Sequence, residues 1–154
     1  MLTAPPRDSD GCVLPHDHDE IGNDDGVIRR ISELWITADK NGNRRISSMA
    51  YKASSGPNGG MSVDLVALIT AGGLDPRVYV TTPRWVGSVI FTAGNLREAG
   101  FRVGYDPLEE QPPDQPANPY HGEVWGAFSK GQQKRLAEMA RWFVALEGVS
   151  LTLG

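Results

Sequence analysis

The chain of 154 residues fits one ordinary domain, and its 40% hydrophobic residues are enough to form a buried core. The net charge of −4 argues against nucleic acid as a partner, because proteins that bind a phosphate backbone carry a basic surface. The single cysteine, Cys12, excludes an internal disulfide and a cysteine-based zinc site. No apolar run reaches the about 20 residues that cross a bilayer, so we expect a soluble cytoplasmic protein with no membrane partner.

Residues 1–25 are predicted to form a flexible N-terminal arm, because they are rich in Pro, Asp and Gly and hold few large apolar side chains. The motif "HDHDE" in this arm sets His16 and His18 beside carboxylates, a pattern that can bind a transition metal. It lies outside any predicted strand or helix, and only one further histidine follows. We therefore interpret the motif as a solvated acidic tract and predict no metal site.

The run "VIRRISELWI" (27–36) is ambiguous, since its apolar residues also fall at helical spacing. Its β-branched and aromatic residues favour a strand. It is followed by Asn41-Gly42, a dipeptide typical of a type I′ turn, and then by "RRISSMAY" (44–51), so a β-hairpin is predicted. The hairpin would carry two pairs of arginines that either form an anion-binding edge or protect an exposed edge strand, namely Arg29–Arg30 and Arg44–Arg45.

The stretch "ADKNGNRRIS" (38–47) resembles the calcium loop of an EF-hand when Asp39 is taken as its first position. Asparagines then occupy the third and fifth positions. However, the sixth position holds Arg44 where the sharp bend needs glycine, and the twelfth holds Ala50, which offers no oxygen ligand. The stretch therefore predicts a turn and argues against a calcium site.

Strands and short helices are predicted to alternate after the Gly- and Pro-rich loop at 54–60. Ser62 is predicted to cap a helix over 63–71 that ends at Gly72-Gly73. The next predicted elements are strands at 77–82, 85–92 and 101–105, with a short helix at 93–100.

The C-terminal third begins with an irregular loop, 106–119, which has five prolines in fourteen residues. A strand is predicted over 121–128, and Ser129 with Gln132 forms a capping box for a helix. The apolar stripe of that helix comprises Leu136, Met139, Ala140 and Phe143. The pattern as a whole predicts a compact α+β domain over 26–154, with a mixed or antiparallel sheet of about six strands and two or three short helices.

The densest run of polar and aromatic residues is "NPYHGEVWG" (118–126), which sets His121 and Glu123 two residues apart. On a strand this spacing projects both side chains to one face, where an imidazole and a carboxylate can work as a pair. His-x-Glu also opens the signature of zinc deaminases, but no cysteine pair follows Glu123, so that family is excluded.

A wider pattern consists of Arg29 or Arg30, then Ser47-Ser48, then Glu123. This order resembles the motif order of arginine-type ADP-ribosyltransferases. The resemblance implies that the arginine binds the pyrophosphate of NAD, the serines shape the nicotinamide pocket, and the glutamate orients the ribose and stabilises an oxocarbenium-like transition state. NAD is the cofactor that it implies.

Two functions follow from these patterns. The first is a non-catalytic binding or accessory module that recognises a protein or a small anionic ligand. The alternative is a small NAD-dependent transferase or hydrolase with a cleft under the loop 106–119. The candidate catalytic residues are Glu123, His121 and Ser47, and the candidate ligand-binding residues are Arg29, Arg30, Ser48, Asn118 and Tyr120. An enzyme requires these groups to converge on one point, and a module does not.

Overall fold

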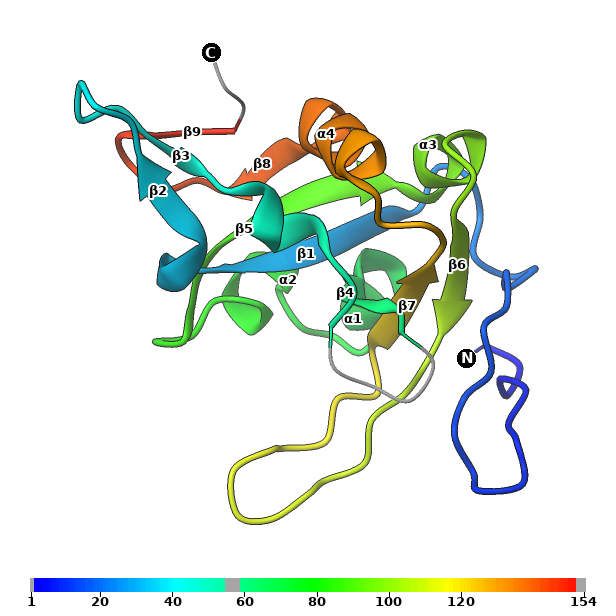
Figure 1. Cartoon of the computed structure of the whole chain (residues 1–154). Coiled ribbons are helices and arrows are strands. Elements are labelled where there is room, and N and C mark those ends of the chain that lie inside the picture. The colour runs from blue at the N-terminus through cyan, green and yellow to red at the C-terminus, as the bar shows by residue number, and fades with distance from the viewer. Residues whose placement is uncertain (1, 55–58, 152–154) are drawn as a thin grey trace.

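The computed structural model describes residues 2–54 and 59–151 and confirms the predicted α+β class (Figure 1). A six-stranded antiparallel sheet has the order β6-β7-β4-β1-β5-β8. Its strands are β1 Gly26–Ser32, β4 Met61–Leu65, β5 Trp85–Thr92, β6 Arg102–Tyr105, β7 His121–Trp125 and β8 Arg141–Val144. A smaller sheet contains β2 Ile36–Ala38, β3 Arg44–Ile46 and β9 Val149–Ser150.

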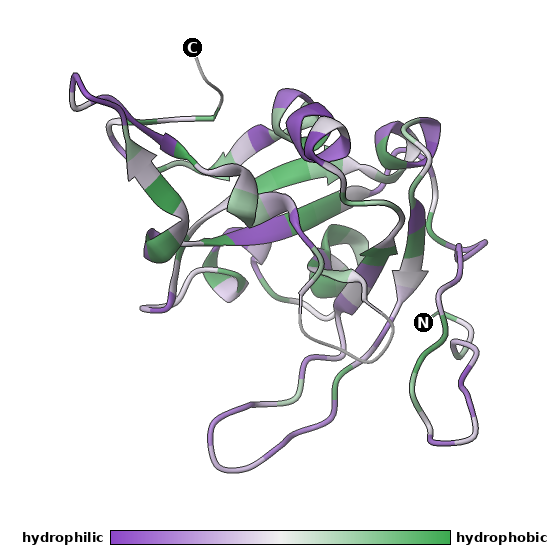
Figure 2. Ribbon diagram, viewed as in Figure 1, coloured by the Kyte–Doolittle hydropathy of each residue, from purple (hydrophilic) through white to green (hydrophobic). Residues whose placement is uncertain are grey.

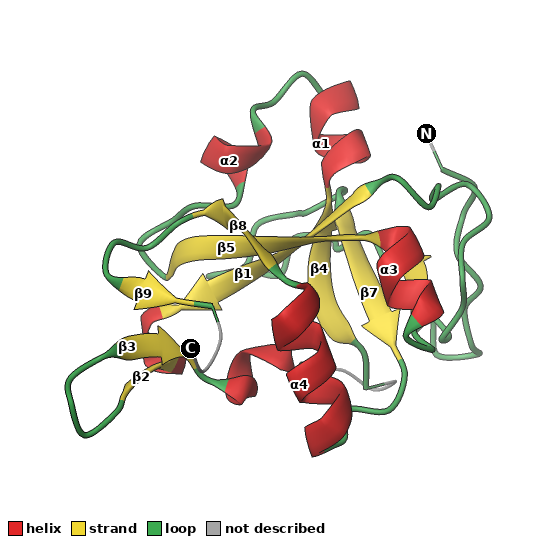
Figure 3. Ribbon diagram, turned by 90° about the horizontal axis from the view of Figure 1, so that it is seen from above, coloured by secondary structure: helices red, strands yellow, loops and turns green. Residues whose placement is uncertain are grey.

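Helices cover both faces of the large sheet (Figure 3). On one face lie α3 (Ala93–Glu98) and α4 (Lys130–Met139), and on the other lie α1 (Val66–Ala71) and α2 (Pro76–Tyr79). Two short 3-10 helices, η1 (Glu33–Trp35) and η2 (Ser48–Tyr51), lie beside the small sheet. None of the helices within the described ranges is long and apolar enough to cross a membrane.

The hydrophobic core divides between these two faces because side chains alternate along each strand. The larger part packs under α4 and includes Val27, Ile31 and Leu136, whereas Ile28 joins Ile69 and Val80 under α1 and α2. Strand β1 carries a hydrophilic segment, Arg29–Arg30, at its centre, and the loop after β6 is largely hydrophilic (Figure 2).

The predicted hairpin is present in a shorter form, because only β2 and β3 pair. The first strand, β1, ends at Ser32 and joins the large sheet, so Arg29–Arg30 and Arg44–Arg45 do not share a hairpin. A type I′ turn needs two positive φ angles, but only Gly42 has one. The Asp39 carboxylate forms the turn instead, by accepting hydrogen bonds from the backbone N–H groups of Asn41 and Asn43.

Between residues 61 and 82, two predicted element types were wrong. Residues 61–65 form strand β4, and α1 begins only at Val66 with no side-chain cap, so Ser62 is not a helix cap. The segment predicted as a strand at 77–82 begins as helix α2, because Pro76 occupies its first turn and Asp75 accepts a hydrogen bond from the Arg77 N–H. In the first case pairing with two neighbouring strands outweighs the local cap signal.

The predicted helices at the end of β5 and after β7 are confirmed. Helix α3 ends before Gly100, whose φ of +93° suits the chain reversal. The Ser129 hydroxyl caps α4 by accepting a hydrogen bond from the Gln132 backbone N–H. The predicted capping box is present only in this half, because the Gln132 side chain donates to the Ala99 carbonyl. Leu136 and Ala140 from its predicted apolar stripe are buried, whereas Phe143 lies in β8.

The N-terminal arm lies along the outer edge of β6 (Figure 1). The carboxylate of Asp17 accepts a hydrogen bond from the Val103 N–H, and His16 Nε2 accepts one from the Tyr105 N–H. The His18 N–H donates to the Val103 carbonyl. The arm thus pairs backbone groups that an exposed edge strand leaves open, and the composition of residues 1–25 did not predict these contacts.

A buried ion pair connects β1 to β4. Nε and one terminal nitrogen of Arg30 donate to the two carboxylate oxygens of Asp64, at 2.8 and 3.2 Å. Asp64 is 3% exposed and also accepts a hydrogen bond from the Asn118 amide, which ties the end of the long loop to the sheet. The guanidinium of Arg30 lies 5.5 Å from the ring centre of Tyr79.

We expect Asp64→Asn to lower the free energy of unfolding by about 3 kcal/mol, because it leaves the Arg30 charge largely buried without its partner. The matched control is Glu33→Gln, which breaks the exposed pair with Arg44 and is expected to cost less than about 1 kcal/mol. Urea unfolding of both variants measures the difference. Equal losses would contradict a structural role for the Asp64 pair.

Candidate functional site

The register of β4 against β7 sets four polar side chains on one face of the sheet. Ser62 lies opposite Glu123, and Asp64 lies opposite His121. Directly opposed residues of an antiparallel pair point to the same face, and alternate residues of one strand do so as well. This is the face that carries α1 and α2, because Ile28, the partner of Asp64 on β1, packs with Ile69. The sheet therefore gathers a hydroxyl, an imidazole and two carboxyls.

His121 is the centre of the group. Its Nδ1 lies 2.7 Å from the backbone carbonyl of Asp106, and its Nε2 lies 2.9 Å from the hydroxyl of Ser62. A carbonyl only accepts, so Nδ1 carries the proton, and Nε2 offers its lone pair to the Ser62 O–H. Burial lowers the pKa of His121. The hydrogen bond to the Asp106 carbonyl and the negative charges of Asp106 and Asp64 oppose this effect and raise the pKa. The neutral ring with a fixed tautomer is therefore the favoured form.

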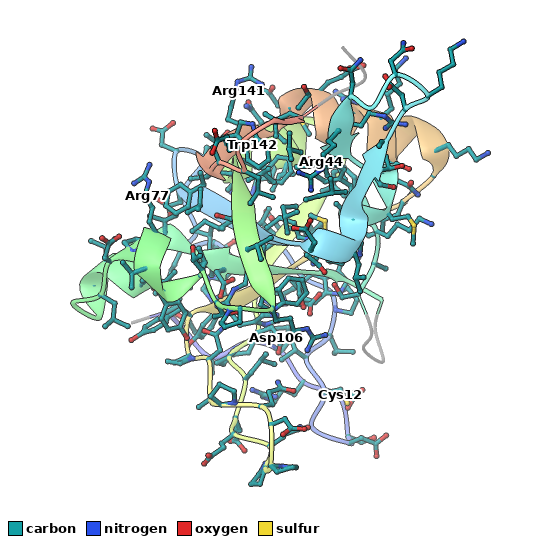
Figure 4. The ribbon with its side chains drawn as sticks, turned by 90° about the vertical axis from the view of Figure 1, so that its left-hand side faces the viewer. Cys12, Arg44, Arg77, Asp106, Arg141 and Trp142 are labelled. Carbon is teal, nitrogen blue, oxygen red and sulfur yellow. The ribbon has the colours of Figure 1, made fainter. Side chains whose placement is uncertain are left out.

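Two carboxyl groups flank the imidazole. Glu123 Oε1 lies 3.8 Å from His121 Nε2 and 3.5 Å from Ser62 Oγ, and Asp106 Oδ2 lies 3.6 Å from His121 Nδ1. Burial, followed by the negative charge of Asp106, raises the pKa of Glu123 to about 8. Asp106 comes from the first position after β6, between the sheet and the long loop (Figure 4). Negative charge in this buried space is thus costly.

Gly60 closes one side of the cluster. A β-carbon at this position would collide with Glu123 Oε2 and would lie 2.8 Å from Trp125 Nε1. The backbone therefore approaches the carboxyl more closely than any other residue would permit. Among the described residues, Glu123 Oε2 has no hydrogen-bond partner.

The Arg30–Asp64 pair and the end of the loop 106–119 form the neighbouring part of this face. The side-chain amide oxygen of Asn118 accepts hydrogen bonds from the Tyr79 hydroxyl and the Tyr120 backbone N–H. The rings of Tyr79 and Tyr120 meet edge to face, with their centres 5.2 Å apart. Of the residues proposed from the sequence, Arg30, Asn118, Tyr120, His121 and Glu123 therefore lie along one side of three adjacent strands and their loop.

Three other predicted site residues lie elsewhere. Arg29 points to the opposite face, is 5% exposed, and donates hydrogen bonds to the backbone carbonyls of Ala50 and Ser62. Ser47 caps η2 by accepting a hydrogen bond from the Met49 N–H. Ser48 begins η2, which packs against α4 on that opposite face. These contacts hold the fold together and do not bring the three residues to His121.

Ser62 and Asp106 were missed as site residues by reasoning from the sequence. The cap signal of Ser62 concealed the alternation of "MSVDL", in which Met61, Val63 and Leu65 are buried in the core. Had this segment been interpreted as a strand, Ser62 and Asp64 would have shared its polar face. No sequence pattern indicated Asp106 as a site residue, because its side chain reaches His121 only if the strand before the loop ends at Tyr105.

We expect the imidazole of His121 to be the neutral Nδ1–H tautomer at pH 7 in chelator-treated protein, because burial lowers its pKa and Asp106 accepts from Nδ1. Long-range proton–nitrogen correlation spectra distinguish the two neutral tautomers and the charged ring. Asp106→Ala serves to show that the backbone carbonyl suffices to fix the tautomer. A charged ring, or an Nε2–H tautomer, at pH 7 would contradict this geometry.

Comparison of the chain with models of protein families gave no match, and comparisons with curated proteins and with solved structures gave none that is significant. Function is therefore inferred from the chemistry of the site itself, because a fold alone does not specify an activity.

Proposed function

We propose that the domain is an enzyme, a small hydrolase or transferase, whose reaction centre is the point where Ser62, His121 and Glu123 meet. The observation that carries the proposal is the 2.9 Å distance between Ser62 Oγ and His121 Nε2, with Glu123 Oε1 within 3.8 Å of both atoms. A binding module has no requirement for a base, a hydroxyl and a carboxyl at one largely buried point, whereas acid–base catalysis does.

The geometry supports activation of an oxygen nucleophile. The hydroxyl of Ser62, or that of a bound water or substrate in contact with Nε2, can give its proton to the imidazole as its oxygen attacks. Asp106 holds the ring through Nδ1, which keeps Nε2 free to accept. The proton then passes to the leaving group, so that His121 returns to its neutral form. Glu123 supplies a carboxyl group beside His121 Nε2, where positive charge develops as the imidazole takes up the proton.

NAD-dependent transfer is a second candidate, which a specific arrangement favours. Arg30, Ser62 and Glu123 come from the adjacent strands β1, β4 and β7 and share one face of the sheet. This is the order arginine, serine, glutamate that the resemblance to ADP-ribosyltransferases implies, with Ser62 in the place expected for Ser47-Ser48. A phosphate group would compete with Asp64 for Arg30, and the carboxyl groups would face the cationic nicotinamide ribosyl centre.

For the hydrolase, we expect His121→Ala to reduce kcat by about a hundredfold or more, because it removes the group that accepts the proton. Turnover is measured on a panel of carboxylic esters, phosphate esters and nucleotides. Ser62→Ala is expected to lower kcat as well, whereas Ser47→Ala is the matched control and leaves kcat unchanged, since Ser47 caps η2 on the other face. Turnover that survives in His121→Ala would refute the assignment. No turnover in any substrate class would favour the binding module.

For NAD, we expect nicotinamide release that falls by about a hundredfold in Glu123→Gln, measured above the Glu123 pKa of about 8, because the amide keeps the shape of the side chain but cannot ionise to the carboxylate. Glu33→Gln, at an exposed position, is the control. Equal release by Glu123→Gln and wild type would exclude the transferase role for Glu123.

A further inference from the structure

The cluster also has the composition of a metal site. Asp106, His121 and Glu123 each offer a ligand atom, and these three atoms lie within 4.8 Å of one another. The side chains of Asp106, His121 and Glu123 are 19%, 6% and 11% exposed. His121 and Glu123 project from β7, and Asp106 directly follows β6, the strand that pairs with β7. The sheet therefore fixes the spacing of the three side chains. The other two histidines of the chain, His16 and His18, belong to the separate motif in the arm.

The orientation of His121 suits a metal ligand. A histidine that binds a metal usually donates its other ring N–H to a carbonyl or carboxylate, and Nδ1 of His121 does so to the Asp106 carbonyl. Its Nε2 and Glu123 Oε1 are 3.8 Å apart. Metal bonds of about 2.0–2.2 Å hold neighbouring ligand atoms about 3–3.5 Å apart, so a small adjustment of the Glu123 side chain allows both to bind one ion. The Asp106 carboxylate must also turn toward Nε2, because its Oδ2 lies 3.6 Å from Nδ1.

Among the described residues, no lysine or arginine forms an ion pair with Asp106 or Glu123. Arg30 already pairs with Asp64, and Arg29, whose charge lowers the pKa of Glu123 against the larger effect of burial, donates its hydrogen bonds on the opposite face. Asp106 and Glu123 therefore share a buried space with a neutral imidazole. Glu123, 8% exposed, leaves Oε2 without a hydrogen-bond partner among the described residues. Buried carboxylates without an ion pair or a full set of hydrogen bonds take up a proton or coordinate a metal.

We propose that Asp106, His121 and Glu123 bind one divalent transition-metal ion, with the Ser62 hydroxyl or solvent completing its coordination. One imidazole and two carboxylates without a thiolate suit Zn²⁺ or Mn²⁺, whereas Mg²⁺ prefers a shell of oxygens alone. The ion takes the Nε2 lone pair that otherwise accepts from Ser62. This deepens the proposed function, because the ion then replaces the imidazole as activator of the oxygen nucleophile. It also favours the hydrolase over NAD transfer.

The test is calorimetric titration of ZnCl₂, MnCl₂ and MgCl₂ into the chelator-treated full chain. We expect one equivalent of Zn²⁺ or Mn²⁺ to bind and Mg²⁺ to bind at least tenfold more weakly. His121→Ala and Glu123→Gln are each expected to weaken the binding at least tenfold. His16→Ala is the matched control and keeps the wild-type affinity, because its ring nitrogens contact the Leu14 carbonyl and the Tyr105 N–H. Circular dichroism verifies that each variant is folded.

A measurement on the unmodified protein keeps the test decisive if a variant does not fold. One equivalent of Zn²⁺ is expected to shift the Nε2 signal of His121 and to leave the ring signals of His16 unchanged. No stoichiometric binding, or binding that is lost in His16→Ala and kept in His121→Ala, would overturn the metal site.

The proposed metal site and the proposed enzyme activity can be refuted independently of each other. Zinc binding at His121 without turnover of any substrate supports the site and contradicts the enzyme. Turnover by chelator-treated protein that binds no metal supports the acid–base enzyme and overturns the metal site.

Discussion

The antiparallel pairing of β4 with β7 is the constraint on which the site depends. Its backbone hydrogen bonds set Ser62 opposite Glu123 and Asp64 opposite His121. A slip of one residue in this register would move each side chain of one strand to the other face. It would also expose Met61 and Val63, which are buried in the core beneath α4. The hydrophobic face of β4 therefore enforces the position of the polar face.

The same face carries two neighbouring groups of buried polar side chains that differ in how they are paired. Asp64 is compensated by Arg30 and Asn118, and this network joins β1, β4 and the end of the long loop. Glu123 and Asp106 are not compensated in the same way, although they lie beside His121. Groups that are costly to bury and lack full pairing mark candidate functional sites. The Arg30–Asp64 pair is therefore structural, whereas the cluster of Asp106, His121 and Glu123 is a candidate functional site.

The long loop, 106–119, and the N-terminal arm both contact the β6–β7 end of the sheet, but at different places. Asp106 and Asn118, near the two ends of the loop, both contact residues of the polar face, so the loop is fixed where it meets the site. The arm contacts the outer edge of β6 and brings His16 against Trp125, with ring centres 5.2 Å apart. Trp125 lies two residues beyond Glu123 on β7. The site is thus enclosed by chain segments that are distant in sequence.

The sequence by itself determined the α+β class, the turn at Asn41-Gly42, the end of α3 at Gly100, the Ser129 cap of α4, and the His121–Glu123 pair. Each of these rests on local chemistry: a capping hydroxyl, a glycine at positive φ, or the two-residue period of a strand. The site as a whole did not follow, because its members come from β4, β7 and the first residue after β6. Only tertiary structure decided that 61–65 is a strand between β1 and β7, since a local cap signal is weaker than a strand's hydrogen bonds and burial on both sides. That decision brought Ser62 to His121 and left Ser47 on the opposite face.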